Sequence, residues 1–232
     1  MTRPRSARAE IVFAAEPRGL AIGATPVAAP AGATKVRTSM AKRLLDIVVA
    51  FAALLLLAPL LLLVALAIVT EDRGPVLFRQ RRTGLNGRVF NICKFRSMRV
   101  ADDDGEVTQA VRGDARTTHV GRVIRKFSID ELPQLLNVLS GDMSLVGPRP
   151  HAVAHDASWS QFVPFYAERF GARPGLTGYA QICGLRGEVR ESSEIFNRVI
   201  ADAHYIKTWS FTFDIYIMYK TIPLLFNDTK AY

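Results

Sequence analysis

The stretch KRLLDIVVAFAALLLLAPLLLLVALAIVTEDR, residues 42–73, holds an apolar segment long enough to cross the hydrocarbon core of a bilayer. Residues 47–69 carry no charge, and Pro59 lies near their centre, where proline interrupts a helix. Two topologies are open: one kinked helix that spans the membrane, or two half-helices that enter and leave by the same face. Basic residues on both sides of the segment resist translocation. We therefore favour a re-entrant helix–break–helix with its bend at Pro59.

Outside this segment the composition indicates anionic partners and a reducing compartment. The 232 residues carry a formal net charge of +9, which suits acidic lipid, nucleic acid or phosphorylated substrates. Cys93 and Cys183 are far apart and lack a His/Cys cluster, so neither zinc nor a disulfide framework is indicated. Residues 1–37 are rich in Ala, Pro, Gly and Arg and are predicted to be a disordered tail. The membrane segment then occupies residues 38–73, and one domain occupies residues 74–232.

The first part of that domain combines two short strands with charge of one sign. Residues 76–78 and 89–92 are rich in β-forming side chains, and the turn dipeptide Asn86-Gly87 lies between them. The charged residues in 74–100 are all basic: Arg79, Arg81, Arg82, Arg88, Lys94, Arg96 and Arg99. A basic run usually forms a solvated face, but one directly after a membrane segment is expected to face lipid headgroups or phosphates. Residues 117–127 then predict an amphipathic helix.

Residues 128–150, SIDELPQLLNVLSGDMSLVGPRP, place two adjacent carboxylates before a helical segment and a cation after it. Ser128 and Glu131 match a capping box, so Asp130 and Glu131 can simply complement the dipole of a helix that begins there. The alternative is a catalytic pair, because carboxylates beside cations suit phosphate chemistry on a metal ion. This segment alone leaves both interpretations open. The prolines on either side of Arg149 make a rigid loop that fixes its direction.

The C-terminal half predicts further helices and one tight turn. Aromatic residues within 152–170 are expected to pack at the membrane face. Residues 173–178, RPGLTG, cannot form a regular helix because they contain a proline and two glycines. A helix is predicted over 192–209, and residues 211–226 predict either an interfacial helix or a buried core helix. The predicted fold class is therefore α+β and helix-rich, with amphipathic interfacial helices beside the membrane segment.

Four segments occur in order along the chain: KRLLDIVVA (42–50), FRQRRTGLNGRVFNICKFRSM (78–98), SIDELPQLLNVLSGDMSLVGPRP (128–150) and RPGLTGYAQICGLRGE (173–188). Each piece is common by itself, but together they resemble the bacterial sugar transferases that act on polyprenyl phosphate, the monotopic phosphoglycosyl transferases. The resemblance covers residue 38 to the C-terminus and favours the catalytic pair over the capped helix. One departure is Ala58-Pro59, where many members carry Ser-Pro. It leaves the hydrogen bonding at the bend open.

The resemblance implies a small cytosolic catalytic domain that moves a sugar 1-phosphate from a UDP-sugar to polyprenyl phosphate and releases UMP. Asp130 is the implied nucleophile, which would form a covalent phosphosugar intermediate before the lipid phosphate attacks. A diphosphate repels an anionic nucleophile unless a metal ion and cations neutralise it, so Mg²⁺ is expected at Asp130 and Glu131. Whether Glu131 positions the metal or handles a proton stays open. So does direct attack by the lipid phosphate, with Asp130 only a metal ligand.

The resemblance also assigns phosphate-binding roles to three cations. Lys94 in KFR, Arg125 before the carboxylate pair and Arg149 in GPRP match positions that hold phosphate in family members. An Arg offers a bidentate fork to phosphate oxygens, and a Lys offers a point charge. Weaker candidates for contacts near the nucleotide are Pro174, Gly175, Thr177 and Gln181.

The implied partners are a UDP-hexose, with glucose or galactose favoured, undecaprenyl phosphate, and the inner membrane, with the catalytic domain on its cytoplasmic face. We expect no nucleic-acid partner, and a homodimer stays open. Such an enzyme would start the assembly of exopolysaccharide, capsule or O-antigen. The alternative is a non-catalytic membrane adaptor that binds anionic lipid or nucleic acid through its basic face. Acids placed among the cations favour the enzyme, because lipid binding alone does not need them.

Overall fold

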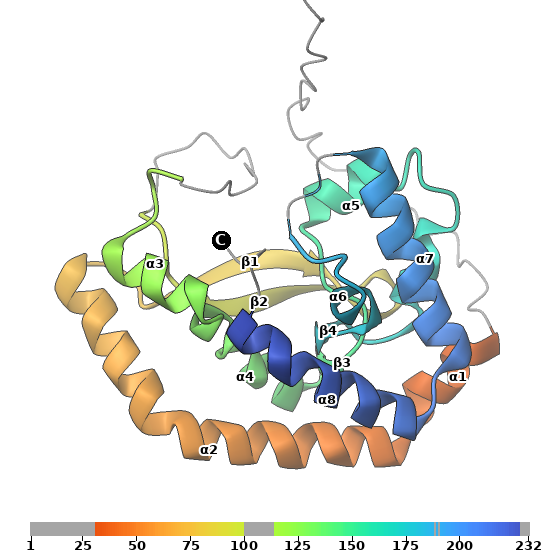
Figure 1. The fold of residues 1–232 in the computed structure, drawn as a ribbon, viewed down its shortest axis with the longest axis horizontal. Coiled ribbons are helices and arrows are strands. Elements are labelled where there is room, and N and C mark those ends of the chain that lie inside the picture. The colour runs from red at the N-terminus through yellow and green to blue at the C-terminus, as the bar shows by residue number, and fades with distance from the viewer. Residues whose placement is uncertain (1–30, 100–113, 188, 190, 228–232) are drawn as a thin grey trace, which may run out of the picture.

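The computed structural model describes residues 31–99, 114–187, 189 and 191–227 of the chain. These residues form an α+β, helix-rich fold in which a long bent helix runs beneath the rest of the domain (Figure 1). In chain order, with η for 3₁₀ helices, the elements are α1 (Ala31–Thr38), α2 (Met40–Glu71), β1 (Leu77–Thr83), η1 (Leu85–Gly87), β2 (Val89–Phe95), α3 (His119–Lys126), η2 (Ile129–Glu131), α4 (Gln134–Ser140), β3 (Ser144–Val146), α5 (Val153–Trp159), η3 (Tyr166–Gly171), β4 (Gly175–Thr177), α6 (Tyr179–Ile182), α7 (Ser192–Thr208) and α8 (Phe211–Asn227).

The apolar segment forms helix α2, which is long and apolar enough to cross a membrane. Ser39 caps its start, because the Ser39 hydroxyl accepts a hydrogen bond of 3.2 Å from the backbone amide of Lys42. Pro59 lies inside α2, and Figure 1 shows the helix bent partway along. Helical structure continues through Pro59, so α2 is one bent helix, where the sequence predicted two half-helices around a break. Many of its apolar side chains are exposed, among them Leu55, Leu56 and Leu62.

Both ends of α2 are held by the same domain. Near its start, the Lys42 ammonium lies 2.7 Å from the Asp214 carboxylate of α8. Asp46 accepts hydrogen bonds from the Ser144 hydroxyl and the Leu145 amide of β3, at 3.1 and 3.0 Å. At the other end, the Glu71 carboxylate accepts bonds of 2.6 and 2.8 Å from the first two amides of α3. A carboxylate at that position suits the positive end of a helix.

Helix α1 lies within the segment that was predicted to be a disordered tail. Ala33 and Val36 are buried and belong to the main apolar core. The prediction is therefore wrong for residues 31–37, and residues 1–30 lie outside the described residues. A helix of eight residues is too short to produce a periodic apolar pattern in the sequence.

The described residues form two small two-stranded sheets. Strands β1 and β2 are antiparallel, with Arg81 opposite Asn91, and the predicted turn is present with φ of 56° at Asn86 and 76° at Gly87. Strands β3 and β4 are parallel, and β4 lies in the segment that was predicted to be non-helical. The residue that follows β3 approaches β4 so closely that a Cβ atom on Gly175 would lie 2.1 Å from the Gly147 nitrogen. Glycine is therefore required at this position.

The predicted C-terminal helices are present as α7 and α8. Helix α8 satisfies both interpretations of its sequence: Ile217 is fully buried in the core, whereas Ile215, Tyr219 and Ile222 are exposed. The helix predicted over residues 117–127 is confirmed as α3.

Some of the aromatic residues of 152–170 pack within the domain. Val163 and Tyr166 form a buried cluster with Ile195 of α7, and Trp159 and Phe170 pack against it. Helix α5 and the upper part of α7 lie on the side of the domain opposite α2 (Figure 1). The expectation of packing at the membrane face is wrong for Trp159, Tyr166 and Phe170, because they pack with apolar side chains of α7. Phe162 and Phe165 are exposed, and for them the expectation stays a prediction.

Candidate active site

The two adjacent carboxylates lie in the 3₁₀ turn η2, between α3 and α4. Ser128, which precedes them, adopts a left-handed conformation with φ of 54° and forms no side-chain cap. A capping serine requires an extended backbone, so the capping-box alternative is wrong. The Ser128 hydroxyl instead accepts a hydrogen bond of 3.0 Å from Arg186, and α4 starts later, after Pro133. The turn therefore presents Asp130 and Glu131 to a neighbouring group of cations.

Glu131 joins two of the predicted cations. Its Oε1 accepts hydrogen bonds from Lys94 Nζ at 2.9 Å and from Arg149 Nη2 at 2.6 Å. Its Oε2 accepts one from Arg149 Nη1 at 3.2 Å, which completes a bidentate contact. Burial by itself raises the pKa of Glu131, but the charges of Arg149 and Lys94 outweigh it and hold the pKa well below its usual value. Glu131 is therefore ionised and holds β2 and the loop after β3 together.

The carboxylate of Asp130 differs from that of Glu131 in its pKa and in its contacts. Burial, with help from the negative charge of Glu131, raises the pKa of Asp130 to about 6, although Lys94, Arg125 and Arg149 act against the rise. Within the described part of the chain, no group hydrogen-bonds to its carboxylate or forms an ion pair with it. At neutral pH this carboxylate is therefore ionised, poorly solvated and available to a ligand or a reacting atom.

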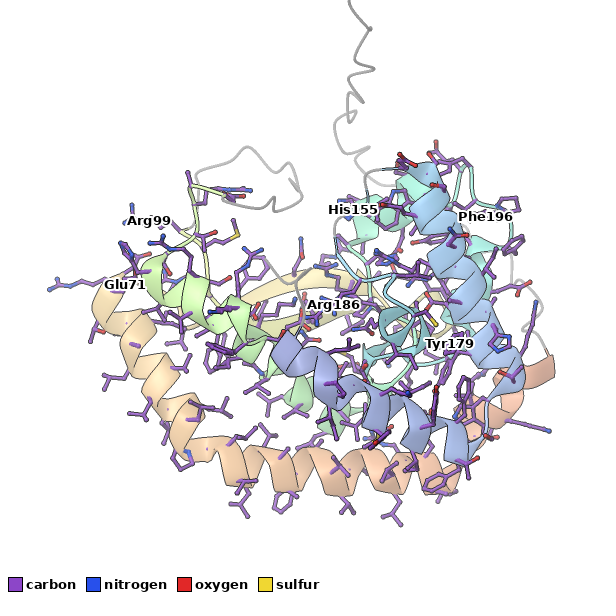
Figure 2. All side chains as sticks on the ribbon, viewed as in Figure 1. Glu71, Arg99, His155, Tyr179, Arg186 and Phe196 are labelled. Carbon is purple, nitrogen blue, oxygen red and sulfur yellow. The ribbon has the colours of Figure 1, made fainter. Side chains whose placement is uncertain are left out.

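A fourth cation, Arg186, belongs to the same group and was not predicted. Besides its bond to Ser128, its charge helps to lower the pKa of Glu131. In the view of Figure 2 the labelled Arg186 lies between α3 and α7. The only sequence signal for it was its place in the GLRGE part of the fourth segment. The structure thus groups Lys94, Arg125, Arg149 and Arg186 around the carboxylate pair.

The weaker candidates have supporting contacts instead. Pro174 and Gly175 exchange backbone hydrogen bonds of 2.9 Å with β3 and the loop that carries Arg149. Thr177 pairs with the Thr221 hydroxyl of α8 at 2.7 Å, and Gln181 is buried with its amide donated to the Leu176 carbonyl at 3.3 Å. None of them has a hydrogen bond or ion pair to Asp130 or Glu131 among the described residues. Their contact with a nucleotide stays a prediction.

The carboxylates fit a magnesium ion that shares phosphate oxygens of a substrate. Among the described residues there is no group of three or more His, Cys, Asp or Glu side chains that could hold a metal ion. Asp130 has two available oxygens, and Glu131 Oε2 accepts its hydrogen bond from one cation among the described residues, Arg149. Mg²⁺ commonly binds proteins through one or two carboxylates and completes its shell with phosphates and water. The donor set therefore fits Mg²⁺.

Fold and site together define a class: a protein with a helix long and apolar enough to cross a membrane, and with a site that gathers cations around a poorly solvated carboxylate. The bacterial sugar transferase family model matches residues 37–228, and the chain belongs to that family of transferase enzymes.

The chain is similar to proteins that are named as glucose-1-phosphate transferases and as an exopolysaccharide production protein. The chain is 54% identical over 198 residues to the UDP-glucose:undecaprenyl-phosphate glucose-1-phosphate transferase of Caulobacter vibrioides, covering 85% of this chain and 74% of that one. A protein of the same name from Escherichia coli is 48% identical over 191 residues, covering 82% of this chain but 41% of that one. The exopolysaccharide production protein PSS of Rhizobium leguminosarum is 45% identical over 186 residues, covering 78% and 92%. The chain thus spans well under half of the E. coli relative.

Proposed function

We propose that this protein transfers hexose 1-phosphate, most simply glucose 1-phosphate, from a UDP-sugar to undecaprenyl phosphate and releases UMP. The observation that carries this proposal is the pairing of an available carboxylate, Asp130, with a second carboxylate that Lys94 and Arg149 hold in place. The names of the similar proteins support glucose as the sugar and exopolysaccharide as the product pathway. An adaptor that binds anionic lipid gains nothing from this pair of acids.

In the proposed first step, an Asp130 oxygen attacks the phosphorus atom that bears the sugar. A new bond forms between this oxygen and phosphorus, the bond from phosphorus to the bridging oxygen breaks, and UMP leaves with that electron pair. Lys94, Arg149 and Arg186 supply positive charge where the two phosphates must approach the carboxylate. With a pKa of about 6, Asp130 is ionised at neutral pH. The raised pKa also makes it a stronger nucleophile than a fully solvated carboxylate.

In the proposed second step, an oxygen of the lipid phosphate attacks the same phosphorus. The bond to Asp130 breaks, the carboxylate is regenerated, and the sugar diphospholipid leaves. We propose that Asp130 and Glu131 Oε2 also hold Mg²⁺, which would neutralise phosphate charge when bound. Glu131 cannot accept a proton readily, because its pKa is held well below its usual value. Its role in this proposal is to place the two cations and a metal ion.

For the membrane, we propose that α2 enters and leaves through the cytoplasmic face. Lys42 and Asp46 near its start and Glu71 at its end are all bound to the one domain. A helix that spans the bilayer would separate its ends by about 30 Å of hydrocarbon. A bent helix held at both ends can instead lower its exposed apolar middle into one leaflet. The exposed apolar face of α8 would then lie at the same interface.

Asp130→Asn tests the reaction in purified membranes or detergent. The variant should retain membrane association but release no UMP from UDP-glucose with undecaprenyl phosphate. Turnover above a few per cent of wild type would show that Asp130 is not the nucleophile. In the wild type, UDP-glucose labelled in its β-phosphate should leave label on the protein when the lipid is omitted. Direct attack by the lipid phosphate would leave none.

A further inference from the structure

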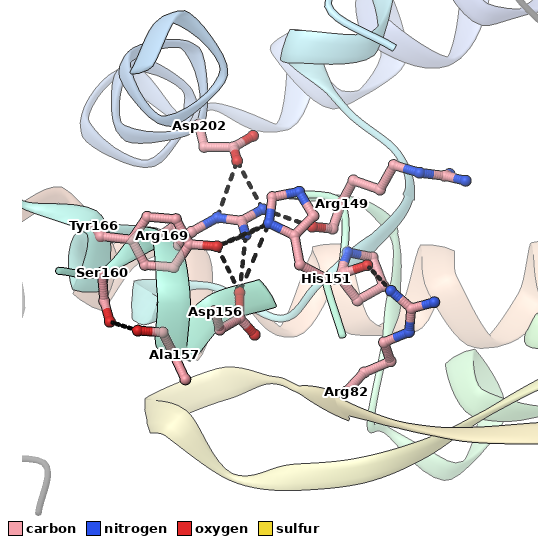
Figure 3. Close-up of polar contacts among 10 residues, drawn as sticks. Arg82, Arg149, His151, Asp156, Ala157, Ser160, Tyr166, Arg169 and Asp202 are labelled. Carbon is pink, nitrogen blue, oxygen red and sulfur yellow. Dashed lines mark hydrogen bonds and ion pairs between the residues drawn. The ribbon is translucent and has the colours of Figure 1, made fainter. Parts of the chain in front are cut away.

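Arg169 of η3 is a buried arginine that the site described above does not use. Only 3% of it is exposed, and its guanidinium lies among polar groups of three elements (Figure 3). It donates to Asp202 of α7 at 3.0 and 3.2 Å, and it lies 3.5 Å from Asp156 of α5. It also contacts the His151 ring and the Tyr166 hydroxyl. Two buried acids therefore balance this buried charge.

One more contact connects this network to the proposed active site. Arg169 Nη2 donates a hydrogen bond of 2.6 Å to the backbone carbonyl of Arg149. With that bond, the five N–H donors of the guanidinium all have partners. The Arg149 carbonyl thus receives a charge-assisted hydrogen bond in a buried environment, where such bonds are strong.

The loop that carries Arg149 depends on contacts of this kind. Pro148 and Pro150 have no backbone N–H, so the loop is fastened mainly through its carbonyls. Three consecutive carbonyls are each held by a different element. An amide of β4 donates to the Pro148 carbonyl at 2.9 Å, Arg169 holds that of Arg149, and Arg82 of β1 donates to that of Pro150 at 3.2 Å. The backbone is fixed on both sides of the Arg149 Cα atom.

The Arg149 side chain leaves this fixed backbone in the opposite direction. Figure 3 shows its guanidinium pointing away from the network of Arg169. At its far end the two terminal nitrogens meet Glu131 at 2.6 and 3.2 Å. A bidentate contact tolerates little displacement of either partner, so a shift of the Arg149 carbonyl would misplace the fork.

We propose that Arg169 is a positioning residue for phosphoryl transfer: it holds the Arg149 carbonyl so that the Arg149 guanidinium meets Glu131 and the substrate phosphates. This inference rests on the proposed function for the reaction that it serves. Arg169 acts through Arg149 and does not touch the reacting atoms. The alternative is a purely structural role, in which Arg169 only balances the negative charges of Asp156 and Asp202 and stabilises the fold. The two alternatives predict different effects on Arg149 when residue 169 keeps its positive charge but loses the planar guanidinium.

Arg169→Lys makes that change, because a single ammonium cannot reach Asp202 and the Arg149 carbonyl with the geometry of a planar fork. Tyr166→Phe is the matched control: it removes a buried hydroxyl from the same network and leaves the bond from Arg169 to Arg149. Thermal unfolding in detergent ranks the stability of both variants. We expect Arg169→Lys to lower kcat/KM for UMP release by about 10- to 100-fold, as misplacement of a catalytic group does. Tyr166→Phe should stay within about threefold of wild type.

A double variant separates positioning from stability. In an Arg149→Met background, Arg169→Lys should cost less than about twofold more, because the residue it acts through is gone. Two results would overturn the positioning role. One is a set of losses in kcat/KM that multiply when Arg149→Met and Arg169→Lys are combined. The other is an equal loss in Arg169→Lys and Tyr166→Phe.

Binding of inorganic pyrophosphate, measured by calorimetry on the purified protein, keeps the test independent of turnover. Arg169→Lys should weaken this binding, and Tyr166→Phe should leave it close to wild type. If the wild type released no UMP from any UDP-sugar, the proposed function would fail while this comparison still held. If the two variants bound pyrophosphate alike, the inference about Arg169 would fail even with an active enzyme.

Discussion

The raised pKa of Asp130 makes the proposed nucleophile visible in a pH profile. Because this pKa lies near 6, the carboxylate loses its charge as the pH falls below 6, and the attack on phosphorus should slow with it. At pH 5 only about one tenth of the carboxylate is ionised, so kcat/KM should be about tenfold below its plateau at pH 8. The UDP-sugar has no group that titrates between pH 5 and 8. The lipid phosphate does titrate there, so the assay should omit it.

The assay is therefore the single-turnover release of UMP from UDP-glucose, followed from pH 5 to 8 in detergent. Lys94→Met removes the largest of the charges that lower the pKa of Asp130 and should raise the acid limb by about one pH unit. Lys207→Met is the matched control, because Lys207 pairs with Glu168 on an exposed surface and should leave the limb unchanged. A flat profile between pH 5 and 7, or an identical limb in Lys94→Met, would refute the reasoning.

The same pKa predicts a cost in stability. Since folding raises the pKa of Asp130 above its ordinary value, its contribution is most favourable below pH 4 and is lost as the pH rises through 6. Asp130→Asn should therefore stabilise the fold at pH 8, by at most about 3 kcal/mol, and this gain should vanish below pH 4. Thermal unfolding of both proteins across this range measures the difference. A variant less stable than wild type at pH 8 would contradict the burial argument.

Three other predictions concern the membrane helix and the close strands. Lys42→Met leaves the buried Asp214 carboxylate without its cation and should lower stability by about 3–5 kcal/mol in denaturant titrations. Adding Asp214→Asn should restore part of this loss. Gly175→Ala places a Cβ atom 2.1 Å from the Gly147 nitrogen and should lower stability by about 3 kcal/mol in the same titrations. The variant should also lose UMP release. Unchanged stability would argue against the close approach. Single cysteines on both flanks of residues 47–69 should react with an impermeant thiol reagent only from the cytoplasmic side; labelling from opposite sides would establish a span.

Several features followed from short stretches of sequence. The uncharged run of residues 47–69 was enough to predict a membrane helix, because its length alone matches the hydrocarbon core. The turn at Asn86-Gly87 was predictable since these residues adopt positive φ at little cost. The four ordered segments identified the family and, with it, the candidate pair Asp130 and Glu131. Each of these signals is carried by neighbouring residues.

Other features depended on the folded chain. Two interpretations were open for Ser128 until the structure showed its left-handed backbone, and Arg186 had no signal of its own. The short helix α1 was missed because eight residues are too few to produce a periodic apolar pattern in the sequence. The path of α2 could not be predicted in detail, since a proline permits a bend but does not enforce a break.

One physical reason separates the features that were predicted from sequence from those that required the structure. Chain length, backbone preferences and apolar runs act over a few residues, so the sequence by itself determined the membrane helix, the hairpin turn and the family. Glu131 meets Lys94 from 37 positions earlier and Arg149 from 18 positions later. Arg169 reaches the Arg149 carbonyl across 20 positions. Desolvation and charge depend on these distant partners, so only the tertiary structure decided that Asp130 has a raised pKa and Glu131 a lowered one.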